Sequence, residues 1–323
     1  MAPKSQAAGS QAAARRSGLT PARKAGIAQI MQYALLDEIL GANVWRQTDI
    51  VFQGGTLIHV AWNSPRFSED LDFMISMDRA KEIKRVMETA ARGLERRIQI
   101  MLPNSEVRLK SPSKDVLELR DVLKYELVWS APDTMGAVRV KAEFFTVEPS
   151  HIEAYRRESA RHEPDAMQIS LRPELAGYDL ADLTVHAVLP AGHPESIYGD
   201  KLVAMAMRPF LKPRDFFDLW WLGTQLGVRV PDGDLHPVMR RSADCYAYTD
   251  GEILQGLNTL MERPPGIVDE IRDNLAAFLP AKVHRQLCSA DAFTAMYRHV
   301  MAEALRLAAV LEPEPCAAPE PAL

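Results

Sequence analysis

The periodicity of apolar residues changes once along this chain of 323 residues. Up to about residue 190, short strand-like apolar runs are mixed with helical segments. From Pro194 almost to Glu312 the spacing is helical and is interrupted only by prolines. Mixed strands and helices followed by helices alone predict an α+β (mixed α/β) fold, in which a mixed sheet flanked by helices precedes an all-helical carboxy-terminal lobe. The expected strands lie at 49–53, 71–75, 116–129, 137–147 and 181–189, and the expected helices of this first part at 27–40 and 78–102.

This change of pattern predicts four segments. Residues 1–24 form a flexible basic tail, rich in Ala and Ser, and residues 312–323 a disordered Pro/Ala/Glu tail. Between them we expect a mixed-sheet domain over 25–192 and a helical domain over 193–311, with the boundary in the segment LPAGHP.

The composition excludes several classes of protein. Lys and Arg number 38 and Asp and Glu 43, which gives a net charge of −5, so the bulk charge does not indicate a nucleic-acid binder, although a local basic groove stays possible. Three cysteines without a C-x-x-C pair indicate neither a disulfide scaffold nor a cysteine zinc site. With no apolar run of about 18 residues and no signal-peptide core, we expect a cytoplasmic protein without a membrane partner.

Two aspartates alternate with apolar residues in the segment RFSEDLDF. On a strand, Asp70 and Asp72 share one face and lie about 6–7 Å apart, while Leu71 and Phe73 share the other. Neighbouring carboxylates repel each other unless a cation lies between them. Magnesium suits this place because it binds one or two carboxylates together with substrate phosphates. Solvated acids at an exposed strand end are the alternative, but the strong strand formers around them favour the metal site.

A glycine turn precedes this strand by roughly fifteen residues. Gly54 and Gly55 follow an apolar run and precede a helical one, so they allow the backbone to approach a ligand closely. The amides at the start of the following helix would then face a phosphate, and Thr56 would donate its hydroxyl or cap the helix. Alone, this segment is equally a plain turn with an N-cap. Together with the aspartates it predicts a phosphate grip beside a metal site, as phosphoryl and nucleotidyl transfer require.

Further candidates lie downstream. Glu143, on an alternating strand, completes a carboxylate triad or forms an ordinary cross-strand salt bridge. Lys201 is a compact charge suited to a triphosphate, and Asp215 or Asp218 would orient it. In the alternative interpretation, Asp215 sits favourably at a helix start and Arg214–Asp218 is a surface pair. Arg66 is a further phosphate candidate that is equally a rim residue.

The segments GGTL at 54–57, RFSEDLDF at 66–73, Lys201 and RDFFDL at 214–219 resemble the AbiEii/AbiGii-type toxin nucleotidyltransferases of the DNA polymerase β-like superfamily. The resemblance covers about residues 25–225 and implies that 25–192 is the nucleotidyltransferase domain of a bilobed protein. Gly55 and Thr56 match the phosphate-binding turn, where the superfamily commonly has serine for the threonine. The matches to the metal-binding acids are Asp70 and Asp72, with Glu143 as the third, and those to the downstream motifs are Lys201 and Asp215.

The resemblance implies a toxin of a bacterial toxin–antitoxin or abortive-infection system, with a cognate antitoxin, a nucleoside triphosphate as substrate and magnesium or manganese as cofactor. Some members of the family modify the 3′ end of tRNA, so we expect transfer of a nucleotide to a tRNA hydroxyl. Two alternatives stay open: transfer to a protein hydroxyl, and a nucleotide-binding toxin that sequesters a partner without chemistry. Phosphorylation of Ser68 beside the metal site is a further hypothesis.

Overall fold

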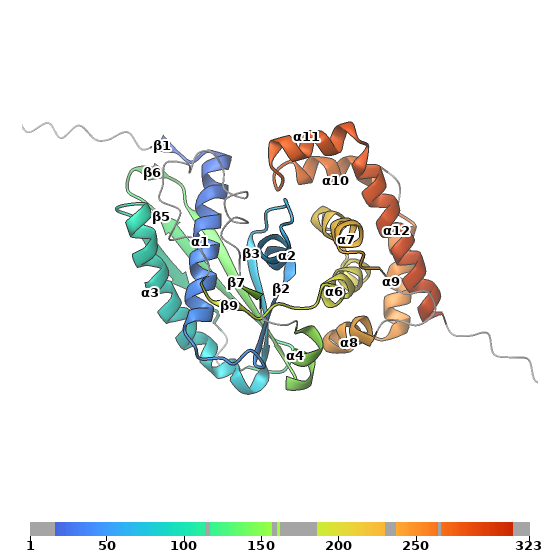
Figure 1. Ribbon diagram of the computed structural model, residues 1–323, viewed down its shortest axis with the longest axis horizontal. Coiled ribbons are helices and arrows are strands. Elements are labelled where there is room, and N and C mark those ends of the chain that lie inside the picture. Colours follow the sequence, from blue (N-terminus) through green and yellow to red (C-terminus); the bar gives the residue numbers. More distant parts are fainter. Residues whose placement is uncertain are drawn as a thin grey trace, which may run out of the picture.

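A mixed sheet lies at the centre of the amino-terminal half of the computed structural model, which describes residues 17–113, 117–156, 160–161, 186–229, 237–263 and 266–312 (Figure 1). Within these residues the sheet has the strand order β2-β3-β7-β5-β4. Only β3 and β7 run parallel; the other neighbours are antiparallel. The strands are β2 (Ile50–Gln53), β3 (Asp70–Ser76), β4 (Glu106–Lys110), β5 (Val122–Ser130) and β7 (Val138–Val147).

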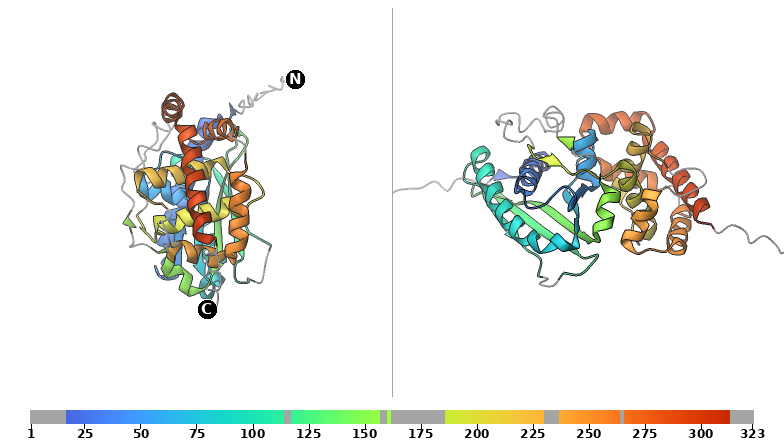
Figure 2. Two further views of the ribbon diagram at one scale, coloured as in Figure 1. Left: turned by 90° about the vertical axis from the view of Figure 1, so that its right-hand side faces the viewer. Right: turned by 60° about the horizontal axis from the view of Figure 1, so that its bottom comes forward.

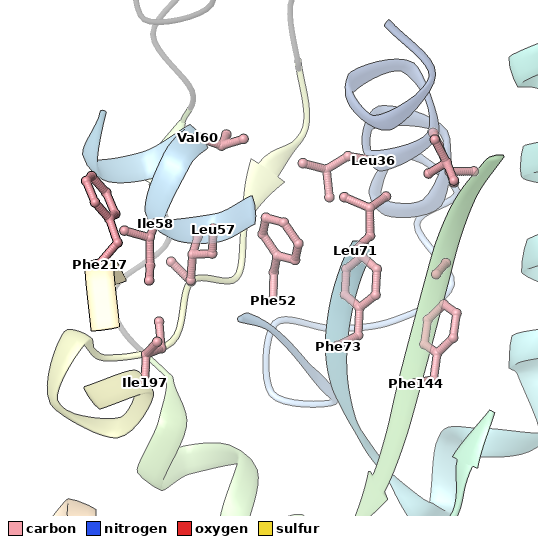
Figure 3. Packing of buried hydrophobic residues seen from close by; sticks show 14 of the residues in the cluster. Leu36, Phe52, Leu57, Ile58, Val60, Leu71, Phe73, Phe144, Ile197 and Phe217 are labelled. Atoms are coloured by element: carbon pink, nitrogen blue, oxygen red, sulfur yellow. The ribbon is translucent and has the colours of Figure 1, made fainter. Parts of the chain in front are cut away.

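One face of the sheet is covered by α1 (Pro21–Gly41) and α3 (Ile83–Met101) (Figure 1). Thr20 caps α1 by accepting a hydrogen bond from the Arg23 amide, and a proline stands in its first turn. Strand alternation turns Leu71, Phe73 and Phe144 to this face, where all three are buried. The rings of Phe73 and Phe144 stack at 5.0 Å (Figure 3).

The other face of the sheet has an apolar end and a polar end. At the apolar end, Met74 and Phe145 pack with residues of α4 (Pro149–Tyr155) and of α8 (Pro237–Tyr246) in a smaller cluster. Two residues earlier on the same face, β3 and β7 carry the charged residues Asp72 and Glu143 in place of apolar ones. The functional site is therefore expected where this cluster ends.

The carboxy-terminal half is helical within the described residues, and its helices lie on the far side of the sheet from α3 (Figures 1 and 2). A short helix, α2 (Gly54–Trp62), joins the halves: Leu57 and Ile58 lie between Phe52 of the sheet and Ile197 and Phe217 of the helical half (Figure 3). The helices are α6 (Pro194–Met207), α7 (Pro213–Gln225), α8, α9 (Asp250–Met261), α10 (Ile267–Leu275), α11 (Ala281–Ser289) and α12 (Ala292–Leu311).

The expected fold class is confirmed, with local differences. The strand expected at 116–129 begins only at Val122, because the chain turns before it: Arg120 has a φ of 67° and the Asp121 carboxylate accepts from the Glu118 amide. Of the strand expected at 181–189, residues 181–185 lie outside the described residues and β9 is Val188–Leu189. Strand β4 was not predicted from the sequence.

The expected helix at 78–102 is present as a short 3₁₀ segment, Met77–Glu82, followed by α3. Most of the tail expected at 1–24, and residues 313–323 of the tail expected at 312–323, lie outside the described residues. None of the helices in the described ranges combines the length and the apolar character needed to cross a bilayer.

Candidate active site

Three carboxylates meet on the polar end of the sheet. Asp70 and Asp72 project from β3, and Glu143 on β7 lies directly opposite Asp72 in the register of the two parallel strands. Lysines flank them: Lys141 Nζ is 3.7 Å from Asp70 Oδ1, and Lys124 Nζ is 3.2 Å from Glu143 Oε1. Asp72 and Glu143 are thus like charges in directly opposed positions, an arrangement that destabilises a sheet unless a cation lies nearby.

The pKa of Asp72 reflects its burial and the carboxylates that surround it. Burial, followed by the neighbouring Asp70 and Glu143, raises the pKa of its carboxyl to about 7, although Lys201 and Lys212 lower it. A positive ligand would offset this effect, because a nearby positive charge favours the ionised form of the carboxyl. The position therefore favours a cation.

The glycine turn packs against this carboxylate. Gly54 opens α2 with a φ of 77°, and a Cβ at that position would lie 2.2 Å from Asp72 Oδ2. A Cβ at Gly55 would lie 2.2 Å from Arg66 Nη2 and 2.9 Å from Ser68 Oγ. No side chain caps the start of this helix, and both glycines line the same cleft as the acids. The backbone therefore approaches the carboxylates closely because side chains are absent.

Thr56 occupies a different place from the one expected of a phosphate ligand. Its hydroxyl is buried and donates a 2.5 Å hydrogen bond to the carbonyl oxygen of Asp70. The side chain lies outside the lining of the cleft, since it is used to fasten α2 to the start of β3. Its structural role is to set the distance between the glycine turn and the aspartates.

A buried network of charges forms the opposite wall of the cleft. Arg66 donates two hydrogen bonds to the Asp218 carboxylate, of 2.6 and 2.7 Å. Lys201 Nζ lies 2.9 Å from Asp215 and 2.7 Å from Asp218, and Arg208 Nη1 lies 2.7 Å from Asp215. The network joins the loop before β3 to α6 and α7, and it brings residues 152 positions apart into contact.

The two carboxylates of the network and their buried partners Arg66 and Lys201 are held in their charged forms. Burial alone disfavours ionisation of Asp215, but Lys201 and Arg208 lower its pKa to about 2. The same opposition acts on Asp218, whose pKa is lowered by Arg66 and Lys201 against the effect of burial. The pKa of Lys201 is raised despite its burial, because two carboxylates surround the amine. The wall therefore presents fixed charge to the cleft.

This network changes the roles expected for two residues. Arg66 is buried and its guanidinium is occupied by Asp218 and by the Phe67 carbonyl, so it braces the wall instead of forming a free phosphate contact. Asp218 is fully buried and holds both Arg66 and Lys201. The surface pair considered for Arg214 and Asp218 does not form: Arg214 pairs with Glu69 at 3.0 Å.

Sequence reasoning did not select two cations of the cleft. Arg208 and Lys212 both line it, and within the described residues Lys212 has no ion-pair partner. Burial and the neighbouring Arg208 lower the pKa of Lys212. Lys212 directly precedes Pro213 at the start of α7, and only the packing of that helix brings its amine near enough to Asp72 to lower the pKa of that carboxyl. The cleft between carboxylates and cations has a volume of about 590 Å³.

The sequence matches the family model "Nucleotidyl transferase AbiEii toxin, Type IV TA system" over residues 40–308. The chain belongs to the AbiEii family. It is a nucleotidyltransferase toxin of a toxin–antitoxin system. The match includes the sheet, the cleft and most of the helical half, so it extends well beyond the segment around 25–225 that carries the sequence motifs. A comparison with curated proteins gives no match.

Two solved structures are similar to this AbiEii chain. One is JHP933 from Helicobacter pylori, with 15% identity, a TM-score of 0.44 and coverage of 89% of this chain and 93% of that one. The other is the nucleotidyltransferase toxin MenT4 from Mycobacterium tuberculosis H37Rv, with 17% identity, a TM-score of 0.43 and coverage of 91% and 95%.

The carboxylates of this AbiEii protein suit a divalent cation by their chemistry. In the part of the chain that the structure describes, no three His, Cys, Asp or Glu side chains are arranged as a ready metal cage. Magnesium does not need one, because it binds through one or two carboxylates plus substrate phosphates and water. Asp70 and Asp72 supply that pair, whereas Glu143 is drawn toward Lys124. The donor set fits a metal that arrives together with a nucleotide.

Proposed function

We propose that this AbiEii toxin transfers a nucleoside monophosphate from a nucleoside triphosphate to the 3′-terminal hydroxyl of tRNA in the cytoplasm, with magnesium or manganese as cofactor. The observation that carries the proposal is one cleft that holds Asp70, Asp72 and Glu143 on the sheet and Lys201 on the helical wall. Acids that bind a cation and fixed cations that bind phosphate are the two requirements of this chemistry.

In the proposed reaction the acceptor oxygen forms a bond to the α-phosphorus while the bond from that phosphorus to the bridging oxygen breaks. Pyrophosphate leaves, and the hydroxyl proton passes to a base, a role that we assign to Glu143 of the sheet. Asp70 and Asp72 would hold a divalent cation, which when bound would neutralise phosphate charge and lower the pKa of the attacking hydroxyl. The Gly54–Gly55 backbone admits the phosphates.

The roles on the helical wall differ between residues. Lys201 and Arg208 offset the charge of the leaving pyrophosphate, while Asp215 and Asp218 keep Lys201 in place. Lys212 adds an amine that forms no ion pair within the described residues, although Asp215 and Asp72 lie near enough to act on its charge. Fixed charges of this kind stabilise a transition state well because they do not reorganise during the reaction.

The open part of the sheet supports a polyanionic acceptor. Strands β4, β5 and β7 carry five cations on the carboxylate face, and their side chains are between 47% and 69% exposed. Two of them, Lys124 and Lys141, also line the cleft. Exposed cations beside the reacting groups attract a phosphate backbone even though the whole chain is acidic. The five are Arg108, Lys110, Lys124, Arg139 and Lys141.

The direct test incubates the purified protein with each labelled nucleoside triphosphate, magnesium and total tRNA. Label on the 3′ end of RNA supports the proposal, and label on protein indicates a protein acceptor instead. The Asp70→Asn variant should lose transfer, whereas Asp78→Asn, an exposed acid outside the cleft, should retain it.

No incorporation with any nucleotide would overturn the proposal. A toxin that only sequesters a partner would stay toxic to cells as Asp70→Ala, whereas the enzyme would not. The family implies a cognate antitoxin, so the toxicity of the wild type and of Asp70→Ala should also be measured with that partner co-expressed. Sequencing cellular RNA 3′ ends after induction would then identify the acceptor.

A further inference from the structure

Three aromatic rings from distant parts of the chain stack beside the acids. Phe145 of β7 and Tyr246 at the end of α8 have ring centroids 5.0 Å apart and planes 12° from parallel. Tyr248 continues the stack beyond Tyr246, at 6.4 Å and 25°. Both tyrosines line the cleft that contains the carboxylates, whereas Phe145 is almost fully buried. The stack therefore runs from the core of the sheet toward the open cleft.

The stack begins one step beyond the catalytic carboxylates. Phe145 follows Glu143 on the same face of β7, and its partner in register, Met74, follows Asp72 on the same face of β3. Side chains two positions apart on a strand are about 7 Å apart. A nucleotide whose phosphates lie at the acids can extend its base toward Tyr246 and Tyr248, because both tyrosines line the same cleft as the acids.

The turn between the two tyrosines is strained. Ala247 has a φ of 58°, a left-handed conformation that glycine adopts far more readily. Two hydrogen bonds close the end of α8: the Ala247 amide donates to the Asp244 carbonyl and the Tyr248 amide to the Ala243 carbonyl. This closure returns the chain so that Tyr248 stacks on Tyr246. A left-handed residue closed by these two hydrogen bonds is a common helix end, and here it fixes the position of Tyr248.

The outer ring is available to a ligand. Among the described residues, Tyr246 is the only aromatic side chain that stacks on Tyr248, and Tyr248 is half-buried, with part of its surface in the cleft. A flat ring supported from behind binds another flat ring in offset stacking, and every nucleobase has such a face.

We propose that Tyr248, supported by Tyr246 and Phe145, is a stacking platform for a nucleobase bound in the cleft. The inference rests on the proposed nucleotidyl transfer and adds a binding residue to it. The base belongs either to the nucleoside triphosphate or to the terminal nucleotide of the acceptor. Stacking on an aromatic ring typically contributes a factor on the order of 5- to 100-fold in affinity, which is large enough to measure.

The experiment measures binding without catalysis. Fluorescence of 2-aminopurine is quenched by stacking, so one probe is a non-hydrolysable 2-aminopurine riboside triphosphate with magnesium, and the other is an acceptor-stem RNA that ends in 2-aminopurine. Tyr248→Leu removes the ring but keeps apolar bulk, and Tyr248→Phe keeps the ring. Thermal unfolding of each full-length variant shows that it is folded.

We expect Tyr248→Leu to bind one of the two probes at least 5-fold more weakly and no longer to quench the fluorescence of that probe. Tyr248→Phe should match the wild type in both measurements. The affected probe identifies the source of the base. Equal affinity of wild type and folded Tyr248→Leu for both probes would overturn the stacking role and leave the proposed function intact. A wild type that binds neither probe would overturn both.

Discussion

At the scale of single residues, the site contains groups whose placement lowers the stability of the folded protein. Asp72 is crowded by two other carboxylates, and Gly54 and Gly55 leave no room for a side chain beside it. Such arrangements persist because the function requires them, and they respond to single substitutions in directions that physical chemistry predicts.

The first prediction concerns Asp72→Asn. The pKa of this carboxyl rises to about 7 in the native protein, against an ordinary value of 3.8, so ionisation destabilises the native state. That destabilisation is absent below about pH 4, where native and unfolded chains are both protonated, and it is complete above about pH 7. Asp72→Asn mimics the protonated form, so it should stabilise the metal-free protein at pH 8 by on the order of 2 kcal/mol and abolish transfer.

Thermal unfolding between pH 4 and pH 8 checks this prediction. The difference from wild type should vanish near pH 4, and magnesium with nucleotide should stabilise the wild type alone. The exposed Asp78→Asn serves as control and should shift neither curve. A variant less stable than the wild type at pH 8 would show that Asp72 is not crowded as described.

The second prediction concerns Gly55→Ala. The new methyl group would meet Arg66 Nη2 at 2.2 Å, and this guanidinium is fixed by Asp218, so α2 must move away from β3. We expect a loss of about 1–3 kcal/mol in stability and a large loss of transfer. Gly251→Ala is the matched control, because nothing lies within 4 Å of its new methyl group in α9. Urea unfolding of both variants measures the effect. A Gly55→Ala variant as stable as the wild type would contradict the close packing of the turn.

At the scale of secondary-structure elements, the buried charges fasten α6 and α7 to the loop before β3. Each carboxylate in this network holds two cations, and Arg66 has Asp218 as its carboxylate partner, so removal of Asp218 leaves a buried guanidinium unpaired. Removing one partner of a buried pair is far more destabilising than removing an exposed pair.

The third prediction follows from that difference. Asp218→Ala leaves the buried Arg66 without its carboxylate partner and Lys201 with Asp215 alone, and it should destabilise the protein by about 3–5 kcal/mol. Glu69→Ala breaks the pair with Arg214 at the surface, where Glu69 is 61% exposed, and should change stability by less than about 1 kcal/mol. Chemical denaturation gives the loss in free energy of unfolding for each variant. Equal losses would contradict the view that the buried charges stabilise the contact between the halves.

At the scale of the whole molecule, one hydrophobic cluster extends from the sheet through α2 into the helical half. The division into a nucleotidyltransferase domain over 25–192 and a helical domain over 193–311 remains a proposal, and the continuous core predicts that the two parts unfold as one cooperative unit. Leu57 and Ile58 are fully buried between the two halves (Figure 3).

The fourth prediction is that residues 25–192 do not fold when expressed alone. Without α6 and α7, the fragment exposes the apolar side of α2 and loses the partners of Arg66. Full-length protein should unfold in one transition by circular dichroism and by tryptophan fluorescence. A soluble fragment with a cooperative transition of its own would instead support two independent domains.

The fifth prediction concerns the acceptor. Arg139→Glu on the open sheet should weaken tRNA binding at low salt and reduce the salt dependence, with the nucleotide affinity unchanged. Arg96→Glu on α3 is the matched control: it is exposed, but α3 covers the opposite face of the sheet. The cations of α3 therefore lie on the face of the sheet away from the acids. If Arg96→Glu weakens tRNA binding more than Arg139→Glu does, the acceptor uses that face.

The sequence by itself determined what depends on neighbours along the chain. Alternation along β3 separates Asp70 and Asp72 from Leu71 and Phe73, and the glycine pair before a helical run predicts the turn that begins at Gly54. These features follow from a strand period of two and from the conformational freedom of glycine, which act over a few residues and so appear in the sequence directly.

Only the tertiary structure decided the rest of the site. The register of β3 and β7 sets Glu143 opposite Asp72. The packing of α7 places Asp218 against Arg66, so the guanidinium binds this carboxylate. The stack that ends at Tyr248 likewise joins a strand to a helix end a hundred residues later. Such contacts depend on how whole elements pack against each other, and no local periodicity encodes which distant partner a side chain will meet.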